Sequence, residues 1–251
     1  MVVKEYGADR EKTVLLLHGG GLSFWNFREE AALLAPDYHV ILPILDGHAG
    51  SDRPFTSIED NASELLSYID ERLGGSVLFI GGLSLGGQIL LELLTMRGDV
   101  CRYALVESAA VIPSRLTNAL IAPSIGCSFG LIRNRGFARM QFRYLRIRDE
   151  LFDAYYRDTC RIEKRDMIAF LRANTSYALK DSIRSASAEV HVCYGEKETM
   201  EIRRSADRIC RTLPSCRRHC LRGLTHGAFS LNHAERYAAL VRRITGEEEG
   251  V

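Results

Sequence analysis

The stretch SVLFIGGLSLGGQILLELL, residues 76–94, decides the fold of this 251-residue chain. Its first half is an apolar run that predicts a strand, and its second half has the periodic apolar pattern of a helix. Between them, Gly82-Leu83-Ser84-Leu85-Gly86 matches G-x-S-x-G, in which the two glycines permit a very tight strand-to-helix turn. The same letters occur by chance in glycine-rich loops. The strand and the helix around them favour the turn, with the Ser84 hydroxyl exposed at its apex.

A second glycine-rich stretch follows an earlier apolar strand. The segment TVLLLHGGGLSFWNF, residues 13–27, contains His18-Gly19-Gly20-Gly21, a loop of the HGGG type that supplies an oxyanion-binding N–H. We expect the N–H of Gly20, with Gly21 as the next choice, to act together with the N–H of Leu85. A phosphate-binding loop would need G-x-G-x-x-G, which the residues after Gly21 do not provide. His18 is expected to hold the loop rather than to react.

Histidine and carboxylate candidates come after Ser84 in the chain. RGLTHGAFSLNHAE, residues 222–235, places His226 in a loop before the last expected helix, whereas His233 lies at the start of that helix. HVCYGEKETM, residues 191–200, is a strand followed by a loop that contains Glu196 and Glu198. A serine hydroxyl needs a histidine to accept its proton and a carboxylate to orient that histidine. The chain order serine, acid, histidine therefore predicts a triad with His226 as the base.

Strands and helices alternate through most of the chain, which predicts an α/β fold with a mostly parallel sheet and helices on both faces. The expected strands are Thr13–Leu17, His39–Leu45, Ser76–Leu83, Arg102–Glu107, Glu189–Tyr194 and Cys216–Arg222. The expected core helices are Phe27–Leu34, Ile58–Leu73, Leu85–Thr95, Ile202–Leu213 and His233–Ile244. From about Val111 to Ala188 only helices are expected: Ser114–Ala122, Gly136–Leu145, Glu150–Thr159 and Lys164–Leu179. We therefore expect a core domain of residues 1–110 and 188–251 and an inserted helical cap of residues 111–187.

Taken together, these motifs resemble the α/β-hydrolase superfamily, in particular its capped, esterase-like members, along essentially the whole chain. The matching segments are HGGG at 18–21, DGHAGSD at 46–52, GLSLGG at 82–87, YGEKE at 194–198 and THG at 225–227. The resemblance implies an α/β-hydrolase fold with a helical cap between two core strands. It also places the triad acid at Glu198, where most members have aspartate. Asp46 and His48 are expected to shape a loop beside the pocket.

Two other glutamates compete with Glu198 for the role of the acid. Glu107 ends the strand before the cap, where an unpaired buried carboxylate would be costly. Glu196 lies two residues before Glu198 in the same loop, closer to the end of the strand. We rank Glu198 first, Glu107 second and Glu196 third, and the choice between Glu198 and Glu107 stays open.

Composition argues against several other classes of function. The net charge of +1 and the 26% of charged residues point neither to nucleic acid nor to a membrane surface. The charged amino terminus does not resemble a signal peptide, and no run reaches the roughly 18 apolar residues that span a bilayer. The seven cysteines are scattered, which predicts free thiols in the cytoplasm, including the clustered Cys210, Cys216 and Cys220. Alternation along the expected strand separates Cys216, His219 and Cys220, so no metal site and no cofactor are expected.

A serine nucleophile predicts acyl chemistry. We expect hydrolysis of an ester-like acyl bond (carboxylester, thioester or lactone) in a small-molecule substrate, through an acyl-enzyme on Ser84. An acyltransferase or a carbon–carbon bond hydrolase on the same triad is the alternative, and a ligand-binding protein without turnover is a third hypothesis. Neither the substrate nor the oligomeric state follows from the sequence.

The lining of the substrate pocket is harder to predict. Gly21, Phe24 and Trp25 are candidates because they lie in or just past the oxyanion loop. A set of apolar residues in the expected cap could line an acyl pocket or could pack on the core, and packing on the core is the commoner case. These residues are Phe129, Leu131, Ile132, Phe137, Met140, Phe142, Tyr144 and Leu145. Four arginines at helical spacing either attract an anionic acyl group or form a solvated face, which we favour: Arg135, Arg139, Arg143 and Arg146.

Overall fold

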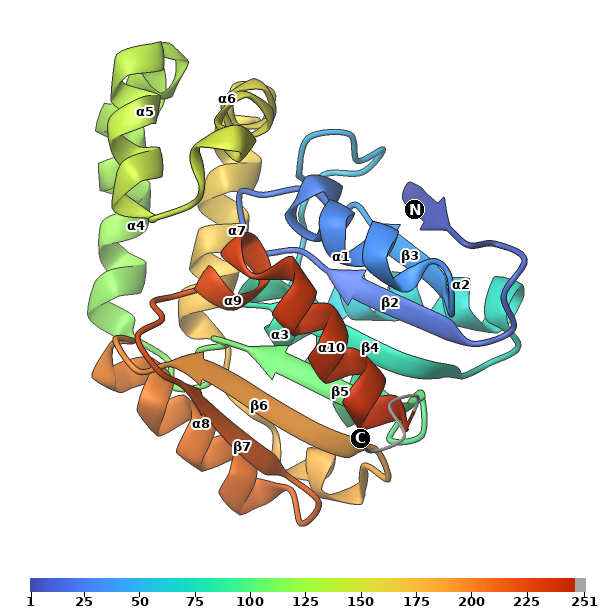
Figure 1. Cartoon of the computed structure of the whole chain (residues 1–251). Coiled ribbons are helices and arrows are strands. Elements are labelled where there is room, and N and C mark those ends of the chain that lie inside the picture. Colours follow the sequence, from blue (N-terminus) through green and yellow to red (C-terminus); the bar gives the residue numbers. More distant parts are fainter. Residues whose placement is uncertain (247–251) are drawn as a thin grey trace.

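A seven-stranded sheet forms the centre of the computed structural model, which describes residues 1–246 (Figure 1). The strands are β1 (Val3–Tyr6), β2 (Thr13–Leu17), β3 (His39–Pro43), β4 (Val77–Leu83), β5 (Cys101–Glu107), β6 (Glu189–Gly195) and β7 (Arg217–Leu221). Their order in the sheet is β1-β3-β2-β4-β5-β6-β7, and every neighbouring pair is parallel except β1 with β3. The predicted α/β-hydrolase fold class is confirmed.

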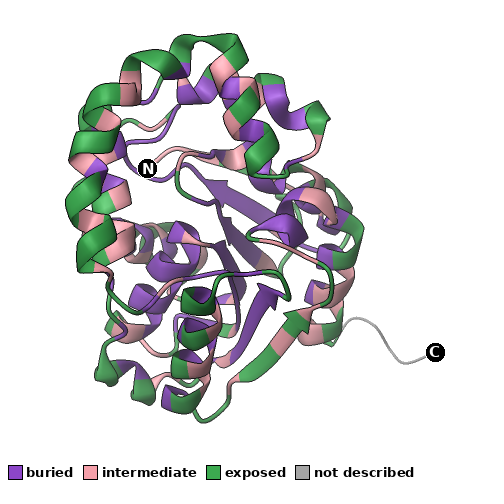
Figure 2. Cartoon of the chain, turned by 90° about the vertical axis from the view of Figure 1, so that its left-hand side faces the viewer, coloured by how far each residue is buried: buried purple, intermediate pink, exposed green. Residues whose placement is uncertain are grey.

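Helices cover both faces of the sheet. The core helices are α1 (Arg28–Leu34), α2 (Ile58–Leu73), α3 (Leu85–Met96), α8 (Met200–Thr212), α9 (Ala228–Asn232) and α10 (Ala234–Thr245). Apolar residues of α2, α3 and α8 pack on one face, and those of α1, α9 and α10 pack on the other. Strands β2 and β4 are almost completely buried between these layers (Figure 2), which explains their continuous apolar sequences.

Four helices are inserted between β5 and β6. They are α4 (Arg115–Ser128), α5 (Arg135–Tyr144), α6 (Phe152–Thr159) and α7 (Lys164–Ser176). The described structure contains no strand between residues 108 and 188, as predicted. Hydrogen bonds tie this insertion to the core: for example, Gln88 Nε2 donates to Asn174 O at 2.8 Å, and Trp25 Nε1 donates to Asp158 Oδ2 at 2.9 Å.

Among the strands and α-helices, two short elements were not expected from the sequence. Strand β1 has two consecutive exposed charged residues, Lys4 and Glu5, and pairs antiparallel at the edge of the sheet, so its pattern carries little apolar signal. Helix α9 has only five residues, which is too short for a helical period to be recognised. The remaining strand boundaries agree with the predictions within two residues. The acidic end of the chain, residues 247–251, lies outside the described residues.

One prediction about the cysteines is wrong. Cys210 and Cys216 form a disulfide with a Cα–Cα distance of 5.0 Å, whereas free thiols were expected. Helix α8 ends at Thr212 and the chain turns at once into β7, which brings the two cysteines together. Because Cys210 and Cys216 are bonded to each other, these two cysteines do not indicate a reducing compartment.

Neither a membrane span nor a metal-binding cluster is found within residues 1–246. No helix there is both long enough and apolar enough to cross a bilayer. No group of three histidine, cysteine, aspartate or glutamate side chains there is arranged to hold a metal ion.

Candidate active site

Ser84 lies at the apex of the turn between β4 and α3. Its φ of 51° is in the left-handed region, which a non-glycine residue rarely adopts. The flanking glycines allow the chain to fold this tightly, because a Cβ atom on Gly82 would lie 2.4 Å from the Gly86 carbonyl oxygen. A Cβ atom on Gly86 would lie 2.2 Å from the Leu17 carbonyl oxygen. The Ser84 N–H donates to the Glu107 carbonyl oxygen at 2.8 Å and so fixes the strained turn to β5.

A cavity of about 90 Å³ brings Ser84 together with His226. Its other lining residues are mostly small or apolar and come from four separate segments: Gly19, Gly20, Leu22, Leu83, Leu145, Ile147, Gly227 and Leu231. Within residues 1–246 the Ser84 hydroxyl forms no hydrogen bond, to His226 or to any other group. Catalytic hydrogen bonds of this kind are often long without a substrate, so the shared cavity is the informative observation.

Hydrogen bonding in the glycine loop leaves one N–H free. The Gly19 N–H donates to Asn26 Oδ1 at 3.2 Å, and the Gly21 N–H donates to His48 Nε2 at 3.0 Å. Among the described residues, the N–H groups of Gly20 and Leu85 have no hydrogen-bond partner. Leu85 is the first residue of α3, where helix geometry provides no acceptor. Gly20 and Leu85 are therefore the two donors available to a developing oxyanion, whereas Gly21 is not.

Two buried histidines support the glycine loop. His18 accepts from the Leu45 N–H at 3.1 Å and donates to the Gly19 carbonyl oxygen at 2.9 Å. Burial, and then the neighbouring His48, lower the pKa of His18 to about 3. Burial also lowers the pKa of His48 to about 4. Both rings are neutral near pH 7 and serve as fixed donors and acceptors, in agreement with the structural roles expected for them.

The Glu198 carboxylate lies against the His226 ring. His226 Nδ1 and Glu198 Oε2 are 3.2 Å apart, and only 1% of the Glu198 side chain is exposed. The other oxygen, Oε1, accepts a 2.5 Å hydrogen bond from the Ser108 hydroxyl. Burial of the ring opposes protonation of His226, but the hydrogen bond and charge of Glu198, with the charge of Glu107, outweigh it. The pKa of His226 is therefore raised above its ordinary value of 6.5.

The two competing glutamates have other partners. Glu107 Oε1 accepts from the N–H groups of Phe229 and Ser230 at 3.2 and 3.3 Å, and burial raises the Glu107 pKa to about 7. Glu196 Oε2 accepts from the Gly223 N–H at 2.8 Å. Neither of these carboxylates is hydrogen-bonded to the His226 ring in the part of the chain that the structure describes.

The predicted pocket residues Gly21, Phe24 and Trp25 do not line the cavity beside Ser84. Gly21 is bonded to His48, and the ring of Trp25 is buried and donates to Asp158 of the insertion. Phe24 faces Lys4, whose Nζ lies 5.7 Å from its ring centre. Phe24 and Trp25 follow the oxyanion loop in the sequence, but they belong to the short helix Phe24–Phe27, where their side chains have these other partners.

Residues of the insertion divide between cavity, core and solvent. Leu145 lines the cavity, Phe142 and Ile132 are buried, and Tyr144 and Met140 are exposed. Arg135 pairs with Asp153 at 2.5 Å and Arg139 pairs with Asp149 at 3.3 Å, both in exposed positions. No arginine is among the residues that line the cavity, which fits the solvated face expected for them.

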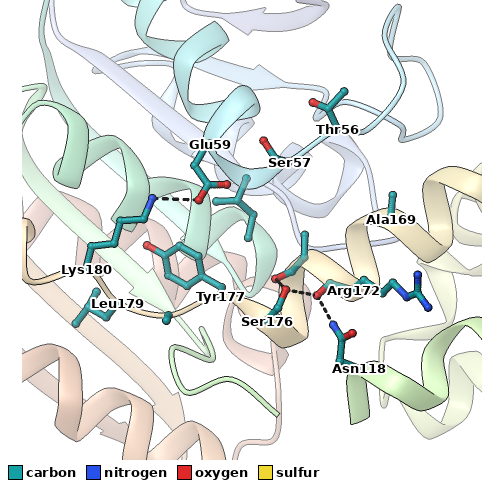
Figure 3. Close-up of a pocket in the computed structure, with 13 residues that line it drawn as sticks. Thr56, Ser57, Glu59, Asn118, Ala169, Arg172, Ser176, Tyr177, Leu179 and Lys180 are labelled. Carbon is teal, nitrogen blue, oxygen red and sulfur yellow. Dashed lines mark hydrogen bonds and ion pairs between the residues drawn. The ribbon is translucent and has the colours of Figure 1, made fainter. Parts of the chain in front are cut away.

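A larger hollow of about 640 Å³ lies elsewhere, between the start of α2 and the end of α7 (Figure 3). The ion pair of Lys180 with Glu59 and the ring of Tyr177 lie in it. Neither Ser84 nor His226 lines this hollow, so it is not the candidate active site although it is larger.

Comparisons with known proteins agree with this fold. The model of the alpha/beta hydrolase family matches residues 14–240. An esterase from Exiguobacterium antarcticum is 18% identical, with a TM-score of 0.82 over 97% of this chain and 94% of the other. A thermophilic esterase from Thermogutta terrifontis is 17% identical, with a TM-score of 0.80 over 98% and 93%.

A meta-cleavage product hydrolase from Pseudomonas fluorescens is 19% identical, with a TM-score of 0.74 over 98% of this chain and 93% of the other. No curated protein sequence matches the chain. Because the family model spans most of the sequence, the chain belongs to the α/β-hydrolase family.

Proposed function

We propose that this protein is a serine hydrolase that cleaves an ester-like acyl bond through an acyl-enzyme on Ser84. The observation that carries the proposal is the cavity that Ser84, His226 and Gly20 line together. Ser84 has a strained backbone and an unbonded hydroxyl there, and the Gly20 N–H is free. Each of the three groups has a separate task in acyl transfer. A binding protein without turnover would have no need of this combination.

The chemistry follows from the role of each group. His226 accepts the Ser84 proton as the hydroxyl attacks the substrate carbonyl, and Glu198 stabilises the imidazolium that forms. The N–H groups of Gly20 and Leu85 bind the oxyanion of the tetrahedral intermediate. His226 then protonates the leaving group. Water, activated by the same histidine, hydrolyses the acyl-enzyme and releases the acid.

The size of the cavity supports a small, uncharged acyl group. A volume of about 90 Å³ with leucine and isoleucine walls holds only a few carbon atoms, and no aspartate, glutamate, lysine or arginine lines it. Leu145 and Ile147 of the insertion contribute to these walls. We therefore propose that residues 111–187 act as a cap that limits acyl length.

The test is turnover of chromogenic p-nitrophenyl esters from acetate to dodecanoate, by the wild type and by Ser84→Ala. Wild-type kcat/KM should be highest for the shortest acyl groups. Ser84→Ala should lower kcat/KM by at least about 10³-fold, because the covalent route is lost. Unchanged turnover in Ser84→Ala would contradict the proposal. Turnover that needs an added alcohol or thiol acceptor would favour the acyltransferase alternative.

A further inference from the structure

Two consecutive residues at the end of β5, Glu107 and Ser108, contact all three loops of the proposed triad. The Glu107 carbonyl oxygen accepts from the Ser84 N–H at 2.8 Å. The Ser108 hydroxyl donates to Glu198 Oε1 at 2.5 Å and lies 3.5 Å from the Gly227 N–H, next to His226. The end of β5 is therefore the place where the nucleophile, acid and histidine loops are joined.

The backbone of Ser108 is held in a strained conformation. Its φ is 53°, one of only three positive values among the non-glycine residues of the described chain. Its N–H donates to the Cys193 carbonyl oxygen of β6 at 2.9 Å, and only 2% of the residue is exposed. A non-glycine residue is strained in this region and persists there only where its surroundings hold it. This conformation aims the hydroxyl at Glu198.

We infer that Ser108 is a positioning residue, whose hydroxyl fixes the Glu198 carboxylate in the orientation that His226 requires. One carboxylate oxygen is bonded to Ser108 and the other to His226, so rotation of the carboxylate would break both bonds. Glutamate has one more rotatable bond than aspartate and loses more conformational freedom when it is fixed. A second bond to a buried hydroxyl offsets this cost. The inference rests on the proposed function for its kinetic consequence only.

Two variants separate the hydroxyl from the backbone. Ser108→Ala removes the hydroxyl and keeps the Cβ atom. Ser108→Gly also removes it but relieves the positive φ, so this variant folds without backbone strain. Ser205→Ala is the matched control, because the Ser205 hydroxyl is also buried and accepts from the Val111 N–H at 3.0 Å, away from Glu198.

Kinetics on a short-chain p-nitrophenyl ester give the first measurement. Both Ser108 variants should lower kcat by about 10–10²-fold, as expected when a catalytic group is misplaced. Their KM should stay within about twofold of the wild type, because Ser108 does not line the cavity. Ser205→Ala should retain wild-type kcat. A wild-type kcat in Ser108→Gly would overturn the inference, because the hydroxyl would then have no role in turnover. This holds whatever the kcat of Ser108→Ala is.

A titration that needs no substrate gives the second measurement. The His226 ring protons are followed by NMR against pH, with His226→Asn used for assignment. Glu198 and Glu107 are the charged groups that raise the His226 pKa, so loosening Glu198 should move the His226 midpoint downward in both Ser108 variants. An unchanged midpoint would overturn the inference. If the wild type hydrolyses no ester, the proposed function fails, and the titration still decides the role of Ser108.

Discussion

The carboxyl edge of the sheet and the helical insertion differ in what they bury. At the sheet edge several buried polar side chains are hydrogen-bonded to the groups around them: Glu198 is bonded to both Ser108 and His226, and the His18 ring is bonded to Leu45 and Gly19. In the insertion apolar side chains face solvent, with Tyr144 88% exposed and Leu116 75% exposed. Arg135 and Arg139 there form ion pairs at the surface, with Asp153 and Asp149.

This difference separates two roles. Buried hydrogen bonds with a single geometry can orient reacting groups, and they tolerate little change. Side chains on helices outside the sheet can be exchanged to change the shape of a cavity while the sheet keeps its structure. We therefore expect substitutions at the sheet edge to affect the chemical step, and substitutions in the insertion to affect substrate choice.

The largest effect should come from Glu198, one of the two buried carboxylates of the sheet edge. Glu198→Gln removes the charge that stabilises the imidazolium and should lower kcat/KM by about 10³-fold. Glu107→Gln keeps an acceptor for the Phe229 and Ser230 N–H groups and should cost less than about tenfold. Ester kinetics on both variants measure the contrast. The reverse ranking would transfer the role of the acid to Glu107.

Glycine-to-alanine changes compare the stability of the two regions. Gly86→Ala would push a Cβ atom to 2.2 Å from the Leu17 carbonyl oxygen and should destabilise the fold by roughly 3 kcal/mol or more. Gly126→Ala in α4 meets no atom within 4 Å and should stabilise it by about 0.5–1 kcal/mol. Urea denaturation gives both values. Equal effects would show that the turn at Ser84 is not tight.

Acyl selectivity should respond to the insertion. Leu145 lines the cavity and is 43% exposed, so Leu145→Ala enlarges the cavity without emptying the core. The ratio of kcat/KM for octanoate to acetate esters should rise by about tenfold, as expected for a few methylenes of apolar contact. Met140→Ala is the control, because Met140 lies in the helix just before Leu145 but does not line the cavity, and it should leave the ratio unchanged. An unchanged ratio in Leu145→Ala would argue against a cap that limits acyl length.

The pH dependence of kcat/KM reports on His226 directly. The histidine must be neutral to accept the Ser84 proton, so activity rises as the pH increases through its pKa. Because that pKa is raised in the folded protein, the acid limb should have its midpoint above 6.5. Glu198→Gln should move the midpoint downward. A midpoint below 6.5 in the wild type would contradict the contact between Glu198 and His226.

The smallest effect is expected on the outer face of the insertion. Arg139→Gln breaks an exposed ion pair with Asp149 at 3.3 Å and should change kcat/KM by less than about twofold. Raising the ionic strength should likewise have little effect on neutral esters. A large decrease in the kcat/KM of Arg139→Gln that is confined to substrates with an anionic acyl group would favour the alternative in which these arginines attract the substrate.

Much of the fold could be predicted because its signals are local. The G-x-S-x-G turn needs glycine at Gly82 and Gly86 for steric reasons, and the buried strands are continuous apolar runs. The antiparallel edge strand β1 and the Cys210–Cys216 disulfide were missed because they depend on the path of the chain in space.

The candidate site follows the same division. Ser84, His226 and Gly20 lie in short motifs, and the structure brings them to one cavity. Ser108 carries no motif, because its importance depends on a strand crossover that joins residues 90 positions apart. Of the cavity lining, Leu145 was among the candidates, whereas Leu22, Ile147 and Leu231 were missed because they come from separate segments.

Covalent labelling tests the central claim most directly. The wild type is treated with a fluorophosphonate, and the modified residue is located by mass spectrometry of peptides. Our account predicts a single adduct on Ser84 that is absent in Ser84→Ala, forms much more slowly in His226→Ala, and forms at the wild-type rate in Ser205→Ala. No adduct in the folded wild type, or an adduct of the same yield in Ser84→Ala, would contradict it.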